Sequence, residues 1–188
     1  MVTDWPGASA GHYQKVPSQI AYQAENEKLL KDTWGYEIPS TANRHCWTKL
    51  LLDQRTKAAV HDDPSLQGKS AMAALPVPHG KSPEDVVADY LTHLYEHCMG
   101  HLEKKMTGPV LKVTPIEFWF TMPAIWSDEA QYSTKAAAER AGFGSSFTRE
   151  NDTINMITEP EAAALAALKL TTDKYDDLLE VWQSDLIA

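Results

Sequence analysis

The sequence has few cysteines and no long apolar run, and each absence excludes a class of protein. With only Cys46 and Cys98 among 188 residues, no disulfide framework can be built, and we expect a protein of a reducing compartment, the cytoplasm. No apolar segment approaches the roughly 18 residues that are needed to cross a bilayer. The first residues have neither a basic flank nor an apolar core, so we expect no signal peptide there.

Positive charge and clustered glycines are also scarce. There are 17 Lys and Arg residues against 26 Asp and Glu, which gives a net charge of −9, so we expect neither nucleic acid nor a membrane as a partner. The nine glycines are scattered, without an adjacent pair, whereas loops that hold phosphate through backbone N–H groups need glycine. At 43% hydrophobic, the chain is nevertheless long enough to bury one substantial core.

The strongest pattern lies between residues 115 and 170 and predicts two strand–helix units. β-Forming residues alternate with more polar ones over 116–122, which indicates a strand. Ser127, followed by two acidic residues, begins a helix that we expect to reach Ala141. Residues 153–158 form a second short strand, and Glu159-Pro160 opens a second helix, because proline is tolerated in the first helical turn. Two such units in succession predict a parallel sheet with packed helices.

Glu159 is the candidate catalytic residue. It stands where a strand ends and a helix begins, so its carboxylate faces the unpaired N–H groups of that helix, which favours the ionised form. A carboxylate at the carboxyl edge of a parallel sheet can hold a hydrated metal ion or orient a water molecule. The alternative is that Glu159 is a plain helix cap.

Three ordered blocks of the chain read Phe120-Thr-Met-Pro-Ala-Ile-Trp-Ser-Asp128, Thr134-Lys-Ala-Ala-Ala-Glu-Arg-Ala-Gly142 and Ile157-Thr-Glu-Pro-Glu-Ala-Ala-Ala-Leu-Ala-Ala-Leu168. These blocks resemble the ATPase domain of 70-kDa heat-shock (DnaK-like) chaperones, in the divergent branch common in filamentous fungi. Shorter matches are Trp34-Gly-Tyr36, Trp47-Thr-Lys-Leu-Leu-Leu-Asp53 and Lys81-Ser-Pro-Glu-Asp-Val-Val-Ala-Asp-Tyr-Leu91. The match covers about residues 14–170, and several blocks in the same order are more specific than one motif.

The resemblance implies an α/β fold: part of an actin-like ATPase (ribonuclease-H-like) lobe, with a mixed sheet and flanking helices. It implies ATP and magnesium as ligands, with Glu159 near the magnesium ion and the attacking water, and Pro123 as a relay of nucleotide state. The family's catalytic lysine has no assigned match here, although Lys49 and Lys57 lie in the right region. The family's basic relay residue on the helix after the proline falls at Gln131.

The two glycine-rich phosphate hairpins of that family have no counterpart in this sequence. The resemblance begins after the first hairpin and ends before the second, so we expect one lobe that does not hydrolyse ATP alone. A shortened product or a non-enzymatic interaction module is the alternative, with a protein partner or a second copy on the exposed half-cleft and the tail.

The resemblance divides the chain into four parts. Residues 1–13 are an N-terminal loop, 14–110 a peripheral subdomain, 111–170 the core sheet and helices, and 171–188 a divergent amphipathic tail. In the peripheral part we expect short strands at 16–22 and 33–38, a short helix over 42–53, an exposed connector over 55–81, and a long helix from Ser82 to about Lys105.

Two motifs point elsewhere. Gly68-Lys-Ser70 and Gly80-Lys-Ser82 copy the end of a phosphate-binding loop but lack its leading glycine, and Ser82 is explained as a helix cap. His93, His97 and His101 stand four residues apart on the long helix, and His93-Leu-Tyr-Glu-His97 fits a zinc-peptidase pattern. These histidines are weak metal candidates, because helical phase puts them beside the apolar stripe, where we expect solvated side chains.

Overall fold

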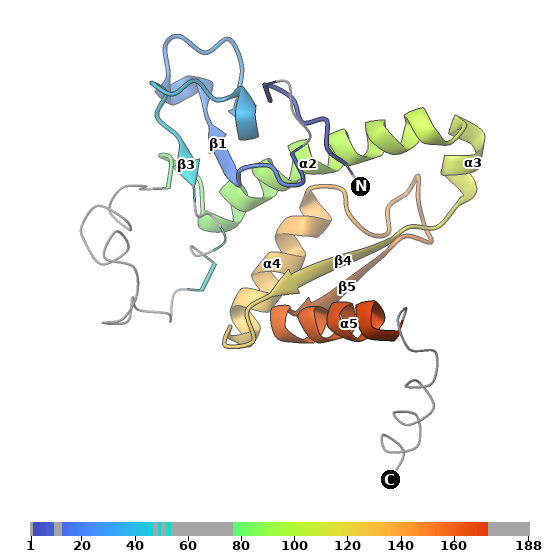
Figure 1. Ribbon diagram of the computed structural model, residues 1–188. Coiled ribbons are helices and arrows are strands. Elements are labelled where there is room, and N and C mark those ends of the chain that lie inside the picture. The colour runs from blue at the N-terminus through green and yellow to red at the C-terminus, as the bar shows by residue number, and fades with distance from the viewer. Residues whose placement is uncertain (1, 10–12, 47–48, 50–51, 54–76, 173–188) are drawn as a thin grey trace.

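The computed structural model describes residues 2–9, 13–46, 49, 52–53 and 77–172. These residues form a mixed α/β fold with two separate sheets (Figure 1). The expectation of one mixed sheet is therefore wrong for the described residues: the antiparallel and parallel strands do not pair with each other. Lys57, Gly68-Lys-Ser70 and most of the predicted tail lie outside the described residues.

The smaller sheet is antiparallel, in the order β2-β1-β3. Its strands are β1 (Gln19–Ala21), β2 (Thr33–Trp34) and β3 (His45–Cys46), and single 3-10 turns follow the first two, η1 (Gln23–Glu25) and η2 (Gly35–Glu37). The strand predicted over 33–38 ends early because Gly35 takes a φ of +57° and turns the chain into η2.

The helix predicted over 42–53 is wrong at β3. His45 pairs with Ile20 and Cys46 with Gln19, and the imidazole of His45 is buried. Its Nε2 lies 2.6 Å from Oε2 of Glu25, and its ring packs on Tyr22. Pairing with β1 and burial of His45 therefore decide the conformation, against the local helical spacing.

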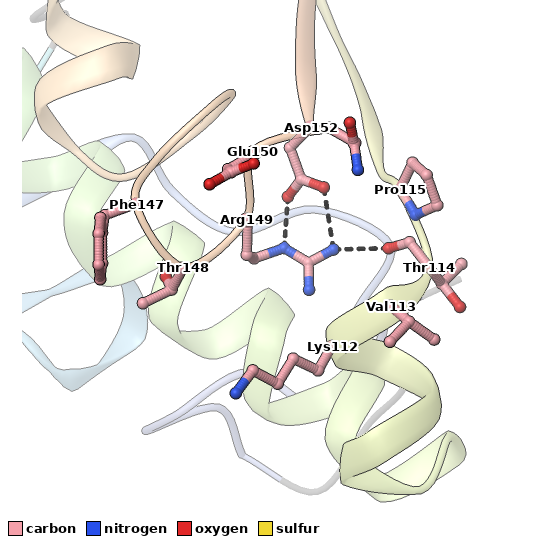
Figure 2. Close-up of a pocket in the computed structure, with 10 residues that line it drawn as sticks. Lys112, Val113, Thr114, Pro115, Phe147, Thr148, Arg149, Glu150 and Asp152 are labelled. Atoms are coloured by element: carbon pink, nitrogen blue, oxygen red, sulfur yellow. Dashed lines mark hydrogen bonds and ion pairs between the residues drawn. The ribbon is translucent and has the colours of Figure 1, made fainter.

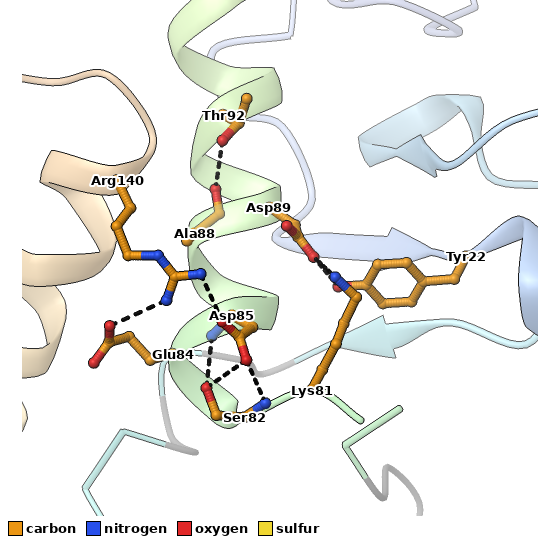
Figure 3. A network of polar contacts seen from close by, with 9 residues as sticks. All are labelled: Tyr22, Lys81, Ser82, Glu84, Asp85, Ala88, Asp89, Thr92 and Arg140. Carbon is orange, nitrogen blue, oxygen red and sulfur yellow. Dashed lines mark hydrogen bonds and ion pairs between the residues drawn. The ribbon is translucent and has the colours of Figure 1, made fainter. Parts of the chain in front are cut away.

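The long helix α2 (Pro83–Lys105) confirms its predicted start and end. Asp85 N donates to the hydroxyl of Ser82 while the Asp85 carboxylate accepts from Ser82 N, so the cap is reciprocal (Figure 3). These bonds and Arg140 hold the pKa of Asp85 well below its usual range. Ser82 is thus a helix cap, and Lys81 contacts Asp89 at 2.6 Å, so this glycine-lysine-serine tripeptide is part of a helix start.

Both sides of α2 are held by other elements (Figure 3). On one side, the hydroxyl of Tyr22 donates to Asp89 at 2.8 Å, and Lys81 lies 5.0 Å from the centre of the Tyr22 ring. Burial, and then the bond to Asp89, raise the pKa of Tyr22. On the other side, Arg140 reaches Glu84 at 3.2 Å and Asp85 at 2.6 Å. Helix α2 therefore joins the small sheet to the C-terminal elements.

The C-terminal elements confirm the two predicted strand–helix units. They are β4 (Glu117–Met122), α4 (Asp128–Arg140), β5 (Thr153–Thr158) and α5 (Glu159–Thr172). Strands β4 and β5 are parallel, with Glu117 opposite Thr153 and Met122 opposite Thr158. The hydroxyl of Ser127 accepts from Ala130 N and caps α4 as predicted. The short helix α3 (Gly108–Val113), which precedes β4, was not expected.

One face of the parallel sheet is covered by the core, whereas the opposite face is exposed along β4 and only partly exposed at Asn155 and Ile157 of β5. The covered face contributes Phe118, Phe120 and Ile154 to a core with α2, α4 and buried Phe143, and Met122 and Met156 pack on Trp126 and Ala130. This core also contains Trp34 and Leu52 from the N-terminal part. On the open face the indole of Trp119 is 59% exposed. No helix among the described residues is long and apolar enough to span a membrane.

Candidate functional site

The predicted site residues meet at the carboxyl ends of β4 and β5. Pro123 directly follows β4, and Glu159 directly follows β5 as the first residue of α5. Because the two strands are parallel and in register, their carboxyl ends lie at one edge of the sheet. The structure therefore places Glu159 where the sequence predicted it.

Lys49 reaches this edge from the N-terminal part of the chain. Its Nζ lies 2.5 Å from Oε1 of Glu159, across 110 residues of sequence, and both side chains are about half exposed. The same ammonium lies 5.8 Å from the centre of the Trp126 ring. The sequence offered Lys49 as one of two unassigned lysines, and the structure pairs it with the predicted carboxylate.

Glu159 is not the cap of α5. The hydroxyl of Thr158 accepts from Glu161 N at 3.3 Å, and Thr158 N donates to the carboxylate of Glu161 at 3.0 Å. Thr158 and Glu161 thus form a reciprocal capping box. The hydroxyl and the N–H of Thr158 also lower the pKa of Glu161. This arrangement leaves the Glu159 carboxylate to Lys49, and the plain-cap interpretation of Glu159 is wrong.

The turn between β4 and α4 forms the rest of the site. Trp126 N donates to the carbonyl of Pro123 at 3.2 Å, and Nε2 of Gln131 donates to the carbonyl of Trp126 at 3.4 Å. The hydroxyl of Ser127 donates to Oδ1 of Asp53, a buried carboxylate, at 3.4 Å. Pro123 and Gln131 therefore belong to one turn beside the Lys49–Glu159 pair.

Two of these residues were not identified from the sequence as site residues. Asp53 is the last residue of the segment predicted as helix, and Trp126 carries no motif of its own. The only signal for either residue is its place within a matching block. In the structure Trp126 contacts Lys49, the partner of Glu159, and Asp53 contacts Ser127 in the turn after β4.

The histidine ladder of α2 lies away from this edge, and aromatic rings pack on two of its three histidines. His93 stacks on Trp34 with 6.0 Å between ring centres, and His97 lies 5.1 Å from Trp5 and 6.1 Å from Trp34. His101 Nδ1 lies 3.3 Å from Asp4. Nε2 of His97 and both ring nitrogens of His101 are buried, so the prediction of solvated side chains is wrong for these two histidines. Burial lowers the pKa of His97.

Metal ligation by this ladder gains no support from the geometry. Within the described ranges, no three His, Cys, Asp or Glu side chains are arranged to hold a metal ion. Cys98, also on α2, is half-buried, and that burial raises the pKa of its thiol.

A pocket of about 330 Å³ lies at the opposite, amino end of the parallel strands (Figure 2). The guanidinium of Arg149 occupies one wall and pairs with Asp152, which is only 3% exposed. Arg149 also donates to the carbonyls of Leu111 at 2.8 Å and Thr114 at 2.7 Å. Asp152 in turn accepts from Ile116 N at 2.9 Å. These bonds tie α3 and the start of β4 to the turn before β5, so the pair has a structural role.

No protein-family model matches the sequence.

Proposed function

We propose that this chain is a lobe of an actin-like ATPase domain of the 70-kDa heat-shock type, and that Glu159 faces the magnesium ion of a bound ATP. One observation carries the proposal: the Glu159 carboxylate stands at the carboxyl edge of a parallel sheet, free of the capping role and paired with Lys49. The order of the matching blocks along the chain supports it further.

The side chains at this edge fit a magnesium nucleotide in charge and ligand type. Magnesium prefers oxygen ligands and is commonly held by one or two carboxylates together with phosphate oxygens and water. A lysine ammonium acts as a point charge toward phosphate. Glu159 and Lys49 supply these two groups 2.5 Å apart, and both are about half exposed, so a ligand can reach them.

The proposed activity is binding without appreciable hydrolysis by this chain alone. Phosphoryl transfer depends on donors placed around the transferred group. The sequence offers no adjacent glycines for a phosphate loop. We therefore expect weak ATP binding, on the order of millimolar, because charge attraction at a half-exposed site is screened by water and salt.

Amide chemical shifts in the presence of Mg·ATP test the proposal. Titration of ¹⁵N-labelled protein to 10 mM Mg·ATP should give saturable changes at the amides of residues 124–130, 158, 159 and 161. Glu159→Gln should weaken this binding at least threefold. Glu161→Gln is the matched control, because it removes the same charge from the same helix end but from the capping box.

Three results would contradict the proposal. No saturable change at this edge, or equal effects of Glu159→Gln and Glu161→Gln, would remove Glu159 from the site. Micromolar binding with phosphate release that is lost in Glu159→Gln would overturn the expectation of negligible hydrolysis.

A non-enzymatic interaction module remains the second candidate function. The observation that favours it is the open face and outer edge of β4, where Trp119 is exposed. That edge supports a more specific inference, which does not depend on nucleotide binding.

A further inference from the structure

The parallel sheet contains only two strands among the described residues. Two strands alone are marginally stable in water, and parallel sheets are usually covered on both faces. Here the covered face packs on the core while the opposite face exposes Trp119. The outer edge of β4 is therefore a place where a further strand could add.

The ladder fixes which backbone groups of β4 point outward. Thr153 N donates to the carbonyl of Ile116 at 3.0 Å. In a parallel ladder, every second residue directs its N–H and C=O toward the neighbouring strand. Glu117, Trp119 and Thr121 therefore direct theirs away from β5, and all three residues are exposed.

The outer edge of β5 is less open than that of β4. By the same alternation, the residues of β5 that direct their backbone N–H and C=O away from β4 are Ile154, Met156 and Thr158. All three are only partly exposed. Thr158 N is used by Glu161, and Gly144 lies close enough to Ile154 that a Cβ would be 3.0 Å from its side chain. An added strand would consequently meet fewer obstacles at β4.

Strand β4 lacks the features that usually protect an edge. Residues 117–122 contain no proline and no lysine, and Glu117 is their only charged residue. Natural edges are commonly protected by lysine, proline or a bulge. An unprotected edge rich in aromatic residues is suited to strand pairing.

We propose that two copies of this chain pair through β4 in antiparallel orientation, about a two-fold axis at Trp119. Trp119 then lies opposite Trp119 of the second copy, Phe118 opposite Phe120, and Glu117 opposite Thr121. Directly opposite residues share a face, so the covered faces align and the two indoles meet on the open face. The result is a four-stranded sheet.

A second copy is the occupant because β4 complements itself in this register. No like charges face each other, since Glu117 meets a threonine. The outward-facing N–H and C=O of Trp119 lie at the axis, where a hydrogen-bonded antiparallel pair exchanges both bonds. Shifting the register by one residue would place the covered face of one copy beside the open face of the other.

Sedimentation equilibrium tests whether the dimer forms. Between about 5 and 500 μM, the mass should rise from 20.9 kDa toward twice that value, since a short edge is a small and weak interface. Trp119→Lys should raise the dissociation constant at least tenfold by placing two like charges at the axis. Phe147→Lys is the matched control: it also replaces an exposed aromatic residue by lysine, away from β4, and should leave the mass unchanged.

Cysteine cross-linking tests the register and does not depend on how Trp119→Lys folds. In a Cys46→Ser, Cys98→Ala background, Trp119→Cys should form a disulfide-linked dimer with diamide. Opposed Cα atoms in a hydrogen-bonded pair lie about 5.5 Å apart, within disulfide range. Thr121→Cys should not cross-link, because its copies lie four residues apart along the strand, about 13 Å.

Each outcome of these two experiments either supports or overturns the proposed dimer. The proposal is supported if the mass of the unaltered protein rises with concentration and this rise is lost in Trp119→Lys. Disulfide cross-linking should then occur at position 119 and not at position 121. A monomer up to 500 μM overturns it, and so does a dimer that is indifferent to Trp119→Lys or that cross-links equally well through position 121.

Discussion

Replacing Arg149 by methionine should be among the most damaging single changes in the C-terminal part of the protein. Arg149 pairs with Asp152 and donates to the carbonyls of Leu111 and Thr114 (Figure 2). Methionine keeps much of the side-chain length but removes every donor. Asp152 would then keep the bond from Ile116 N as its only contact among those described above.

The expected loss of stability depends on which polar groups stay buried without a partner after the substitution. Thr114 lines a pocket of about 330 Å³, so water can replace the donor that its carbonyl loses at modest cost. Leu111 is buried and does not line that pocket, so the loss of its donor adds to the cost. The carboxylate of Asp152 is 3% exposed, and removing one partner of a buried ion pair costs about 3–5 kcal/mol. Since domains are stable by about 5–15 kcal/mol, this loss is about a fifth or more of the total.

Urea unfolding followed by circular dichroism measures this loss. Arg149→Met should lower the free energy of unfolding by about 3–5 kcal/mol, or the melting temperature by roughly 6–20 °C for a domain of this size. Arg149→Met combined with Asp152→Asn should recover part of the loss, because the unpaired charge is gone. A loss below about 1 kcal/mol, or no recovery in the double variant, would refute the reasoning that desolvation of Asp152 dominates.

Two further predictions concern the packing around α2. Gly142 has a φ of +102°, and an added Cβ would lie 3.0 Å from the Tyr95 ring, so Gly142→Ala should cost about 1–3 kcal/mol in urea unfolding. Gly100→Ala, in the same protein but inside α2 with nothing near the new atom, should instead stabilise by about 0.5–1 kcal/mol; the opposite ranking would contradict this. Because burial lowers the pKa of His97, the folded state takes up its proton less readily than the unfolded state. Stability from this group is therefore present above the unfolded pKa of about 6.5 and is lost as pH falls through the folded value. The melting temperature should fall between pH 7.5 and 5.5, and less so in His97→Phe, which keeps a ring against Trp5 and Trp34; an equal fall in both proteins would exclude His97 as the cause.

Where local signals agreed, the sequence predicted the structure well. Alternating residues, the Ser127 cap and Glu159-Pro160 gave β4, α4, β5 and α5 with nearly their observed limits. These elements are decided by contacts close in sequence, because caps, strand alternation and helix starts act over a few residues. Their parallel arrangement followed from the order strand–helix–strand, since a helix must carry the chain back to the start of the next strand.

Where contacts distant in sequence decided the outcome, the sequence was a poor guide. His45 became a strand residue because β1 was available to pair with it. His93 and His97 of α2 are partly covered because Trp34 and Trp5 of the N-terminal part of the chain pack on them. Helical phase placed these histidines correctly beside the apolar stripe but could not reveal what lies against that side.

The first turn of α5 contains one carboxylate whose contacts are close in sequence and one whose contact is distant in sequence. Glu159 and Glu161 both stand at the start of α5, where the helix dipole favours negative charge. The capping box uses Glu161, and its hydrogen bonds to Thr158 are local. Glu159 instead meets Lys49, a contact that only the tertiary fold provides.

This difference bears directly on what each carboxylate can do. Displacing the Glu161 carboxylate would break its hydrogen bonds from the N–H and the hydroxyl of Thr158, which are half of the capping box, at about 1 kcal/mol or more. The Lys49–Glu159 pair is half exposed, and exposed pairs are worth about 0–1 kcal/mol. A cation could therefore take Glu159, and an anion Lys49, at little cost to the fold. That low cost makes Glu159, rather than its neighbour two residues on, the carboxylate suited to a ligand that carries both charges.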